Sequence, residues 1–217
     1  MKGLRLLLLA SLLGAWAAGG AGAAQALRFD QVFGDAPVSL HYSAQYQARG
    51  ASHRLEAWVD RGTRLKRVTD QAVETYAERA GAREPEYRMT VLDLRRRIVT
   101  RIDRTNLMRI GNFTDWFELA HALRVPRGDY RLERAAAPAG AGRPVAACDW
   151  YRVTQDGQAS TICWSRPAAL PLSIVTGDGH EVWRVTALER GPVAGSVFAV
   201  HDEGFVRNDA NEDIEHD

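Results

Sequence analysis

The sequence is poor in lysine and cysteine, and it lacks the short motifs of common enzymes. Lys2 and Lys66 are its only lysines, and it has only two cysteines. It has no G-x-S-x-G, H-E-x-x-H or phosphate-loop motif, and no dinucleotide-binding fingerprint after a strand. The patterns typical of hydrolase, metalloprotease and nucleotide chemistry are therefore missing. We expect a protein that is not an enzyme, with no catalytic residues, no cofactor and no bound metal.

Neither sign of charge dominates the chain. It contains 28 basic and 27 acidic residues, a formal net charge of +1. This balance gives no reason to expect a nucleic-acid partner. Arginines such as Arg95, Arg97 and Arg101 are spaced along the predicted strands. We interpret the run Arg95-Arg96-Arg97 as a solvated edge rather than an anion site.

One long apolar run is present, at the N-terminus. Residues 6–16 follow the basic Lys2 and Arg5, and a small-residue stretch then ends in Ala24-Gln25-Ala26. This pattern predicts a secretory signal peptide over residues 1–26, cleaved near Ala26. The alternative is a membrane anchor, but the run is shorter than the roughly 20 residues a spanning helix needs. We expect no transmembrane segment in the mature chain, and no lipid anchor, because no cysteine lies at the cleavage point.

Cys148 and Cys163 are the only cysteines. Residues 154–157 between them have the composition of a four-residue hairpin loop. If Val153 faces Gln158, the two cysteines lie directly across from each other at a non-hydrogen-bonded position, where opposed Cα atoms are about 4.5 Å apart. The pattern predicts a cross-strand disulfide that closes a loop of about 15 residues and contributes about 3 kcal/mol. The alternative is two buried free thiols, which an oxidising compartment disfavours.

Apolar and polar residues alternate with a period of two through most of residues 27–208, which we expect to form one domain. Leu40, Tyr42 and Tyr46, for example, alternate with His41 and Ser43. Short connections between such runs favour consecutive antiparallel pairing. The predicted strands cover residues 40–49, 54–60, 64–69, 73–79, 87–91, 98–103, 172–176 and 182–188, with an edge strand over 198–206.

The period changes over residues 113–124, where Trp116, Leu119 and Leu123 fall at helical spacing. We predict one amphipathic helix there, with Thr114 as its N-cap and Pro126 marking its end. Residues 135–147 then form a loop rich in Ala, Pro and Gly. The fold class is therefore mainly β, with an inserted amphipathic helix.

The last residues, 209–217, form an acidic tail. Oxygen-bearing side chains at every second position are superficially similar to a calcium loop, but the central glycine and the distant bidentate glutamate are missing. We interpret the tail as a solvated acidic end.

The order of these elements resembles a known family. An exported series of antiparallel strands, an inserted helix and closing strands is similar to the lipoprotein-carrier superfamily of the bacterial periplasm, the LolA, LolB and RseB type of half-barrel. Residues 57–66 are similar to its second hairpin, and residues 170–174, 179–188 and 198–204 are similar to its closing strands. The resemblance implies a periplasmic half-barrel, a curved antiparallel sheet whose concave face accepts acyl chains or lipidated proteins. The chain lacks the lipid-bearing cysteine of LolB-type members, and no ligand-gripping residue of LolA matches a position in it.

The leading hypothesis is a non-enzymatic periplasmic binding or carrier protein for lipid or lipoprotein. Burying an acyl chain gains about 0.8 kcal/mol per methylene, so an apolar wall can bind one without polar signature residues. We expect the partner to be an acyl chain, a lipoprotein or a periplasmic envelope protein. The residues expected on the apolar wall are Leu40, Tyr42, Tyr46, Leu55, Val59, Tyr87, Met89, Val91, Trp116, Leu119 and Leu123.

Three alternatives stay open. An interaction module in envelope sensing or assembly, resembling the RseB role, would bind a protein through its sheet edge and arginine-rich strands. A half-barrel filled by its own Trp116, Leu119 and Leu123 would leave no hollow for a ligand. An enzyme is the least supported, because His121 beside the apolar stripe of the helix has no partner that the sequence places near it.

Overall fold

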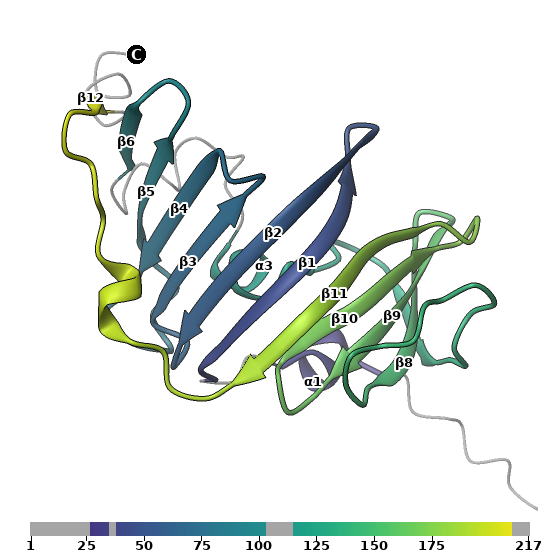
Figure 1. The fold of residues 1–217 in the computed structure, drawn as a ribbon. Coiled ribbons are helices and arrows are strands. Elements are labelled where there is room, and N and C mark those ends of the chain that lie inside the picture. The colour runs from purple at the N-terminus through teal and green to yellow at the C-terminus, as the bar shows by residue number, and fades with distance from the viewer. Residues whose placement is uncertain (1–26, 35–37, 103–114, 210–217) are drawn as a thin grey trace, which may run out of the picture.

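The computed structural model describes residues 27–34, 38–102 and 115–209. Twelve strands form one open sheet in the order β12-β6-β5-β4-β3-β2-β1-β11-β10-β9-β8-β7, which curves around two short helices, α1 and α3 (Figure 1). This confirms the predicted class: mainly β, with a curved and largely antiparallel sheet and an inserted helix. Within the described ranges, no helix is long and apolar enough to cross a membrane.

Two antiparallel meanders build the sheet. The first consists of β1 (Leu40–Ala48), β2 (Ala51–Asp60), β3 (Arg64–Thr69), β4 (Val73–Glu78), β5 (Arg88–Asp93) and β6 (Ile98–Ile102). The second consists of β7 (Arg131–Arg134), β8 (Asp149–Gln155), β9 (Gln158–Ser165), β10 (Leu170–Thr176) and β11 (Glu181–Arg190). The alternating patterns therefore predicted most strands to within a few residues, whereas β7 and the helix α1 (Phe29–Val32) were missed because each has only four residues.

The two meanders meet in the middle of the sheet. β1 pairs antiparallel with β11 from Leu40 opposite Arg190 to Tyr46 opposite Trp183, with a register irregularity after Ser43. On its other side β1 pairs with β2. The first strand of one meander is thus joined to the last strand of the other, and the apolar sides of both meanders form one continuous face.

We call the side of the sheet that carries Leu40, Tyr42 and Val59 the inner face, and the side that carries His41 and Glu56 the outer face. The alternation of buried and more exposed residues along β1 and β2 separates the two faces. Both helices pack on the inner face (Figure 1). The main hydrophobic core therefore lies between the inner face and these short helices.

Two irregular segments lie on the outer face. Residues 195–205, which we call the strap, cover β4, β5 and β6 and begin with a 3-10 helix, η1 (Gly195–Phe198). On the second meander, Gly142 in the predicted loop lies against the guanidinium of Arg184 on β11. The outer face of β1, β2 and β3 lies between these two covers (Figure 1).

The inserted helix is shorter than predicted. α3 spans Trp116–His121, and its N-cap is Asp115, whose carboxylate accepts a hydrogen bond of 2.8 Å from the Glu118 N–H. The choice of Thr114 as N-cap was therefore wrong, and Thr114 itself lies outside the described residues. The helix ends because Ala122 adopts a left-handed conformation, with φ 51°, so Pro126 does not terminate it.

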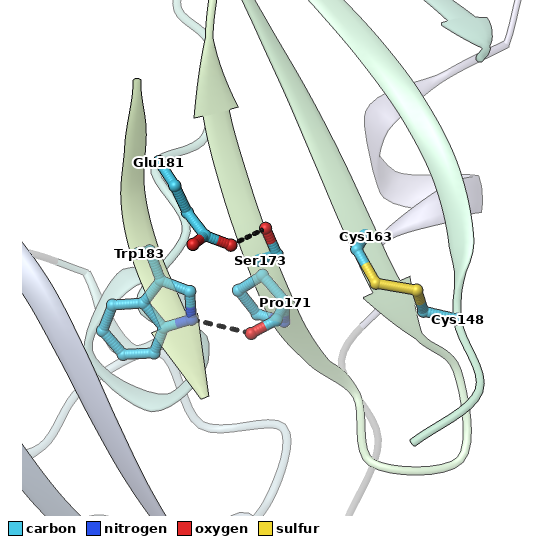
Figure 2. The surroundings of a disulfide bond; sticks show 6 residues. All are labelled: Cys148, Cys163, Pro171, Ser173, Glu181 and Trp183. Atoms are coloured by element: carbon cyan, nitrogen blue, oxygen red, sulfur yellow. Dashed lines mark hydrogen bonds between the residues drawn. A yellow bond between two sulfur atoms is a disulfide. The ribbon is translucent and has the colours of Figure 1, made fainter. Parts of the chain in front are cut away.

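The predicted disulfide is present, but its register was predicted incorrectly. Cys148 and Cys163 are bonded with their Cα atoms 5.4 Å apart (Figure 2). The hairpin loop has two residues rather than four, because Gln155 pairs with Gln158 and both loop residues have positive φ, as a type I′ turn requires. Consequently Trp150 rather than Cys148 faces Cys163. The bridge ties the residue just before β8 diagonally to β9.

The end of the chain also differs from the prediction. Residues 198–206 do not form the predicted edge strand, because most of them belong to the irregular strap. The edge strand is β12 (Val206–Asp209). β12 pairs in parallel with β6, because the strap carries the chain back along the sheet before it pairs. Asp209, assigned to the acidic tail, belongs to this strand, and the rest of the tail lies outside the described residues.

Replacing both cysteines with alanine should lower the free energy of unfolding by about 3 kcal/mol, because the bridge closes a 15-residue separation in the unfolded chain. Urea denaturation of the oxidised protein and the double variant measures the difference. Reduced wild-type protein is the matched control and should behave like the variant. Equal urea midpoints for the oxidised protein, the reduced protein and the double variant would contradict a stabilising disulfide.

Candidate functional site

The inner face carries an apolar row that crosses six strands. Cross-strand pairing sets the residues side by side, from Leu40 opposite Val59 through Leu65 and Ala77 to Met89 opposite Ile102. All six belong to one hydrophobic cluster and are buried. The strand registers thus bring these residues, of which Leu40, Val59 and Met89 were predicted, into one continuous apolar surface.

The wall is covered by the protein's own helix. Trp116, Leu119 and Ala120 of α3 belong to the same buried cluster as the strands. The ring of Tyr87 meets the ring of Trp116 edge-on, with centroids 5.5 Å apart. Of the eleven predicted wall residues, the nine that are fully buried have exposures between 0 and 8%. Native side chains thus occupy the inner face.

The structure groups the predicted wall residues unevenly. Leu40, Tyr42, Leu55, Val59, Tyr87, Met89, Trp116 and Leu119 share the main cluster, while Tyr46 and Val91 are half-buried against it. Leu123 lies beyond the end of α3 in a second cluster with Phe33 and Trp164. It does not join the helical stripe, because α3 ends two residues earlier. The role of these residues in ligand binding stays a prediction.

Two arginines hold α3 against the sheet, and the sequence reasoning missed both. Arg67 of β3 points to the inner face and donates a hydrogen bond of 3.4 Å to the Leu119 carbonyl. The buried Arg79 donates to the Gly62 carbonyl at 2.6 Å, and its guanidinium lies 4.3 Å from the Trp116 ring centroid. The alternation from Leu65 could have placed Arg67 on the inner face, whereas nothing in the sequence indicated Arg79.

Polar groups are also buried within the inner face. The hydroxyl of Tyr42 and the indole nitrogen of Trp116 have no hydrogen-bond partner among the described residues. Burial raises the pKa of Tyr42, and the nearby Arg67 guanidinium opposes that shift. Burial likewise raises the pKa of Tyr87 to about 12, assisted by the negative charges of Asp115 and Glu118. Both phenols are therefore neutral at physiological pH.

The outer face between the two covers is polar, and most of its charges are paired. His41 stacks on Trp58 with centroids 4.8 Å apart and hydrogen-bonds to Glu56 at 2.9 Å. Lys66 lies 5.0 Å from the ring centroid of Tyr76 and 3.4 Å from the Glu74 carboxylate. Beside this row lies a depression of about 340 Å³, lined by Ser43, Ala44, Gln45, Arg54, Leu55, Glu56, Val68, Asp70, Gln71 and Thr186. We call it the outer depression.

Two buried ionisable side chains serve the fold. Asp60 accepts hydrogen bonds from Ser39 at 3.0 Å and from Arg64. Burial alone would raise the pKa of Asp60, but these hydrogen bonds and the charges of Arg61 and Arg64 together lower it. His121 is buried on α3, and its Nδ1 donates to the Ala169 carbonyl. The structural role predicted for His121 agrees with this contact.

Neighbouring polar contacts fix the strands beside the disulfide. The Trp183 indole donates to the Pro171 carbonyl at 2.8 Å, and the Ser173 hydroxyl donates to Glu181 at 2.7 Å (Figure 2). Across the part of the chain that the structure describes, no group of three or more His, Cys, Asp or Glu side chains could hold a metal ion. The inner face and the outer depression are both candidate binding surfaces.

The comparisons with known proteins found similarity only among solved structures. No protein family model matches the sequence, and no curated protein matches it. A crystal structure of MucB is 18% identical, with a TM-score of 0.41, covering 81% of this chain and 62% of that one. The Pseudomonas aeruginosa MucA/MucB complex is 20% identical, with a TM-score of 0.37, covering 77% of this chain and 58% of that one. PNGF-II is 9% identical, with a TM-score of 0.42, covering 82% of this chain and 32% of that one.

The chain thus spans less than two thirds of each of these proteins. With identities of 20% or less and TM-scores near 0.4, these likenesses establish neither a family nor a function. The resemblance to the lipoprotein-carrier superfamily stays a prediction. Its expected architecture, a curved sheet with a helix against one face, is what the strands and α3 form.

Replacing Asp60 with Asn should lower the free energy of unfolding at pH 7 by about 2 kcal/mol, because charge-assisted hydrogen bonds become neutral ones. The pKa of Asp60 is lower in the folded state than in the unfolded state. Ionised Asp60 therefore stabilises the fold fully above its unfolded pKa near 4, and this contribution is lost as the pH falls through its folded pKa. The variant should therefore lose stability less steeply below about pH 4. Denaturation curves at several pH values measure this.

The same substitution at Asp156, which is exposed in the type I′ turn, is the matched control. It should change neither the stability at pH 7 nor its acid dependence by more than about 0.5 kcal/mol. Identical acid profiles for wild type and Asp60→Asn would contradict the role given to this carboxylate.

Proposed function

We propose that this protein is an exported, non-enzymatic module of the bacterial periplasm that binds another protein through its outer face. The observation that carries the proposal is the filled inner face: its wall residues are buried beneath α3. A hydrophobic surface that already packs on native side chains gains nothing further from a ligand unless the helix leaves. Recognition by the folded protein therefore falls to the outer face.

The chemistry of the outer face supports a protein partner. Aromatic and charged side chains alternate across β1, β2 and β3, with Trp58 between His41 and Lys66. Protein interfaces are enriched in aromatic residues and arginine, and complementary charges select their partners. Arg54 and Glu56 line the outer depression from neighbouring outward positions of β2. They offer both signs of charge to a partner's side chains.

The disulfide supports export. A bridge between Cys148 and Cys163 persists in an oxidising compartment and is rare in a reducing one. The signal peptide predicted over residues 1–26 lies outside the described residues. Export to the periplasm, with cleavage near Ala26, is therefore part of the proposal, and the N-terminal sequence of the mature protein tests it.

A non-enzymatic role is consistent with how the buried ionisable groups are used. Asp60 binds the side chains of Ser39 and Arg64, and His121 binds the Ala169 carbonyl. Both are only 3–5% exposed. A general acid or base must reach a substrate, and these contacts direct both groups into the fold.

A carrier of acyl chains is the second candidate, and the shortness of α3 favours it. The helix has six residues, and the apolar row beneath it extends across six strands. An acyl chain that replaced the side chains of Trp116 and Leu119 would gain about 0.8 kcal/mol for each buried methylene. In this candidate the helix moves aside and the wall residues contact the ligand.

Photo-crosslinking tests the protein-binding proposal. A photoreactive residue at Gln45, which lines the outer depression, should form a crosslink to one periplasmic protein in stoichiometric yield. Lys66 is the only lysine after residue 26 and lies between Trp58 and Tyr76, so amine-reactive reagents are unsuitable. Exchanging charges with Arg54→Glu and Glu56→Arg should reduce the crosslink at least tenfold, because like charges oppose at the contact.

The matched control exchanges charges on the outer face away from the depression, with Arg131→Glu and Glu133→Arg on the edge strand β7. These two residues form a 2.9 Å ion pair with each other, which the exchange preserves. The control should crosslink like wild type. Equal crosslinking by all three proteins would reject binding through the outer depression.

Removing the tryptophan that plugs the wall separates the two candidates. Trp116→Ala should destabilise a self-filled core by about 3–5 kcal/mol without creating lipid binding. Uptake of a fluorescent fatty acid and an organic extract of purified wild-type protein measure lipid binding directly. Fatty-acid uptake that increases in Trp116→Ala, or a stoichiometric lipid in the wild-type extract, would favour the carrier over the protein-binding module.

A further inference from the structure

An apolar patch lies on the outer face of β4, β5 and β6, where the sheet would otherwise be polar. Tyr76, Leu92 and Val99 are 6%, 0% and 1% exposed. Their cover is the strap, whose Val200 and Phe205 pack against them. An irregular segment is thus already bound to the outer face, and its apolar Val200 and Phe205 lie on either side of a turn in which the Phe205 N–H donates to the Asp202 carbonyl at 3.1 Å.

Arginines from β6 and the turn before it bind the strap between these two apolar residues. The Arg101 guanidinium forms a 2.7 Å ion pair with Asp202. Arg97 donates to the Glu203 carbonyl at 3.0 Å, and its guanidinium lies 5.0 Å from the ring centroid of Phe205. The groove therefore selects a segment with an acidic residue between two apolar ones.

The strap leads into the one strand pair that departs from the pattern of the sheet. Among the eleven pairings of the described strands, only β12 with β6 is parallel. The first backbone bond there joins the Val206 N–H to the Arg97 carbonyl at 2.8 Å. Val206 is 67% exposed, and Arg207 and Asn208 are also exposed, so this strand is held by its backbone rather than by buried side chains.

The strap also leaves space beneath it. A cavity of about 270 Å³ lies between η1 and the outer face of β3, β4 and β5, with Arg64, Tyr76, Arg88, Phe198 and Val200 in its lining. Arg64 lies 4.6 Å from the ring centroid of Phe198. This pocket is partly open to solvent, so η1 does not close completely over the sheet there.

We propose that the outer face of β4, β5 and β6 is an exchangeable docking groove for a polypeptide segment of a partner protein. The partner segment carries an acidic residue between two apolar ones, pairs with the edge of β6 and displaces the strap. This inference rests on the proposed protein-binding function and names the chemistry of the partner. Edge strands with unpaired backbone groups accept such segments as an added strand, with side-chain pockets setting the specificity.

Because the strap belongs to the same chain as the groove, it competes with any partner segment for that groove. A segment linked to its own groove acts at a high effective concentration, so a free segment of the same sequence binds the intact protein weakly. Loosening the strap lowers this competition and raises the apparent affinity of the free segment. The effect can be measured with the protein's own sequence as the probe.

The test uses a fluorescent peptide of residues 195–209 and the full-length protein. In the double variant Asp202→Ala and Phe205→Ala, which loses the ion pair and the aromatic contact of the strap, the peptide should bind at least tenfold more tightly than to wild type. Adding Arg97→Ala and Arg101→Ala to that variant should abolish binding. His201→Ala, an exposed residue of the same segment, is the matched control and should bind the peptide like wild type.

The proposal is wrong if the peptide binds the double variant no more tightly than wild type. It is also wrong if the double variant folds but does not bind the peptide. If the double variant does not fold, hydrogen exchange of the wild type decides instead. The Val206 amide should exchange at least tenfold faster than the Leu92 amide of the interior strand β5, and equal protection would overturn the proposal. Partner crosslinking at Gln45 that persists while the peptide fails to bind rejects the groove alone. Peptide binding without any crosslinked partner rejects the proposed function alone.

Discussion

The pairing of β1 with β11 is the constraint on which the rest of the structure depends. It joins the first strand of one meander to the last strand of the other, so a single face extends across both. Long-range pairing of this kind costs loop-closure entropy, and buried neighbours such as Tyr42 and Val185 compensate for it. Without this ladder the two meanders would bury separate, smaller cores.

The inner face follows from this arrangement. A row of apolar side chains on a curved sheet needs cover, and α3 provides it through Trp116 and Leu119. Arg67 then binds the Leu119 carbonyl of the helix, and Arg79 packs on the indole ring of Trp116. A half-barrel built in this way satisfies its hydrophobic surface internally. The outer face carries paired charges and two irregular covers.

Local patterns predicted the elements better than their connections. The period of two along β1 and β2 specified which residues are buried, since it depends only on how side chains alternate. The disulfide was predicted correctly although its register was not, because Asp156 and Gly157 alone form the turn. The end of α3 was missed because Ala122 adopts a left-handed conformation, which helical spacing does not reveal. β7 and α1 are too short for a periodic signal.

The sequence by itself determined the mainly β class, the polarity of the strands with alternating residues and the pair of cysteines that would be bridged. These features depend on local residue patterns and on there being only two cysteines. Only the tertiary structure decided that β1 joins β11, that α3 fills the wall, and that the C-terminal segment returns to the outer face of β4, β5 and β6. The reason is that these contacts join residues far apart in the sequence, such as Arg101 with Asp202 and Leu40 with Arg190. Their complementarity becomes visible only when the fold brings them together.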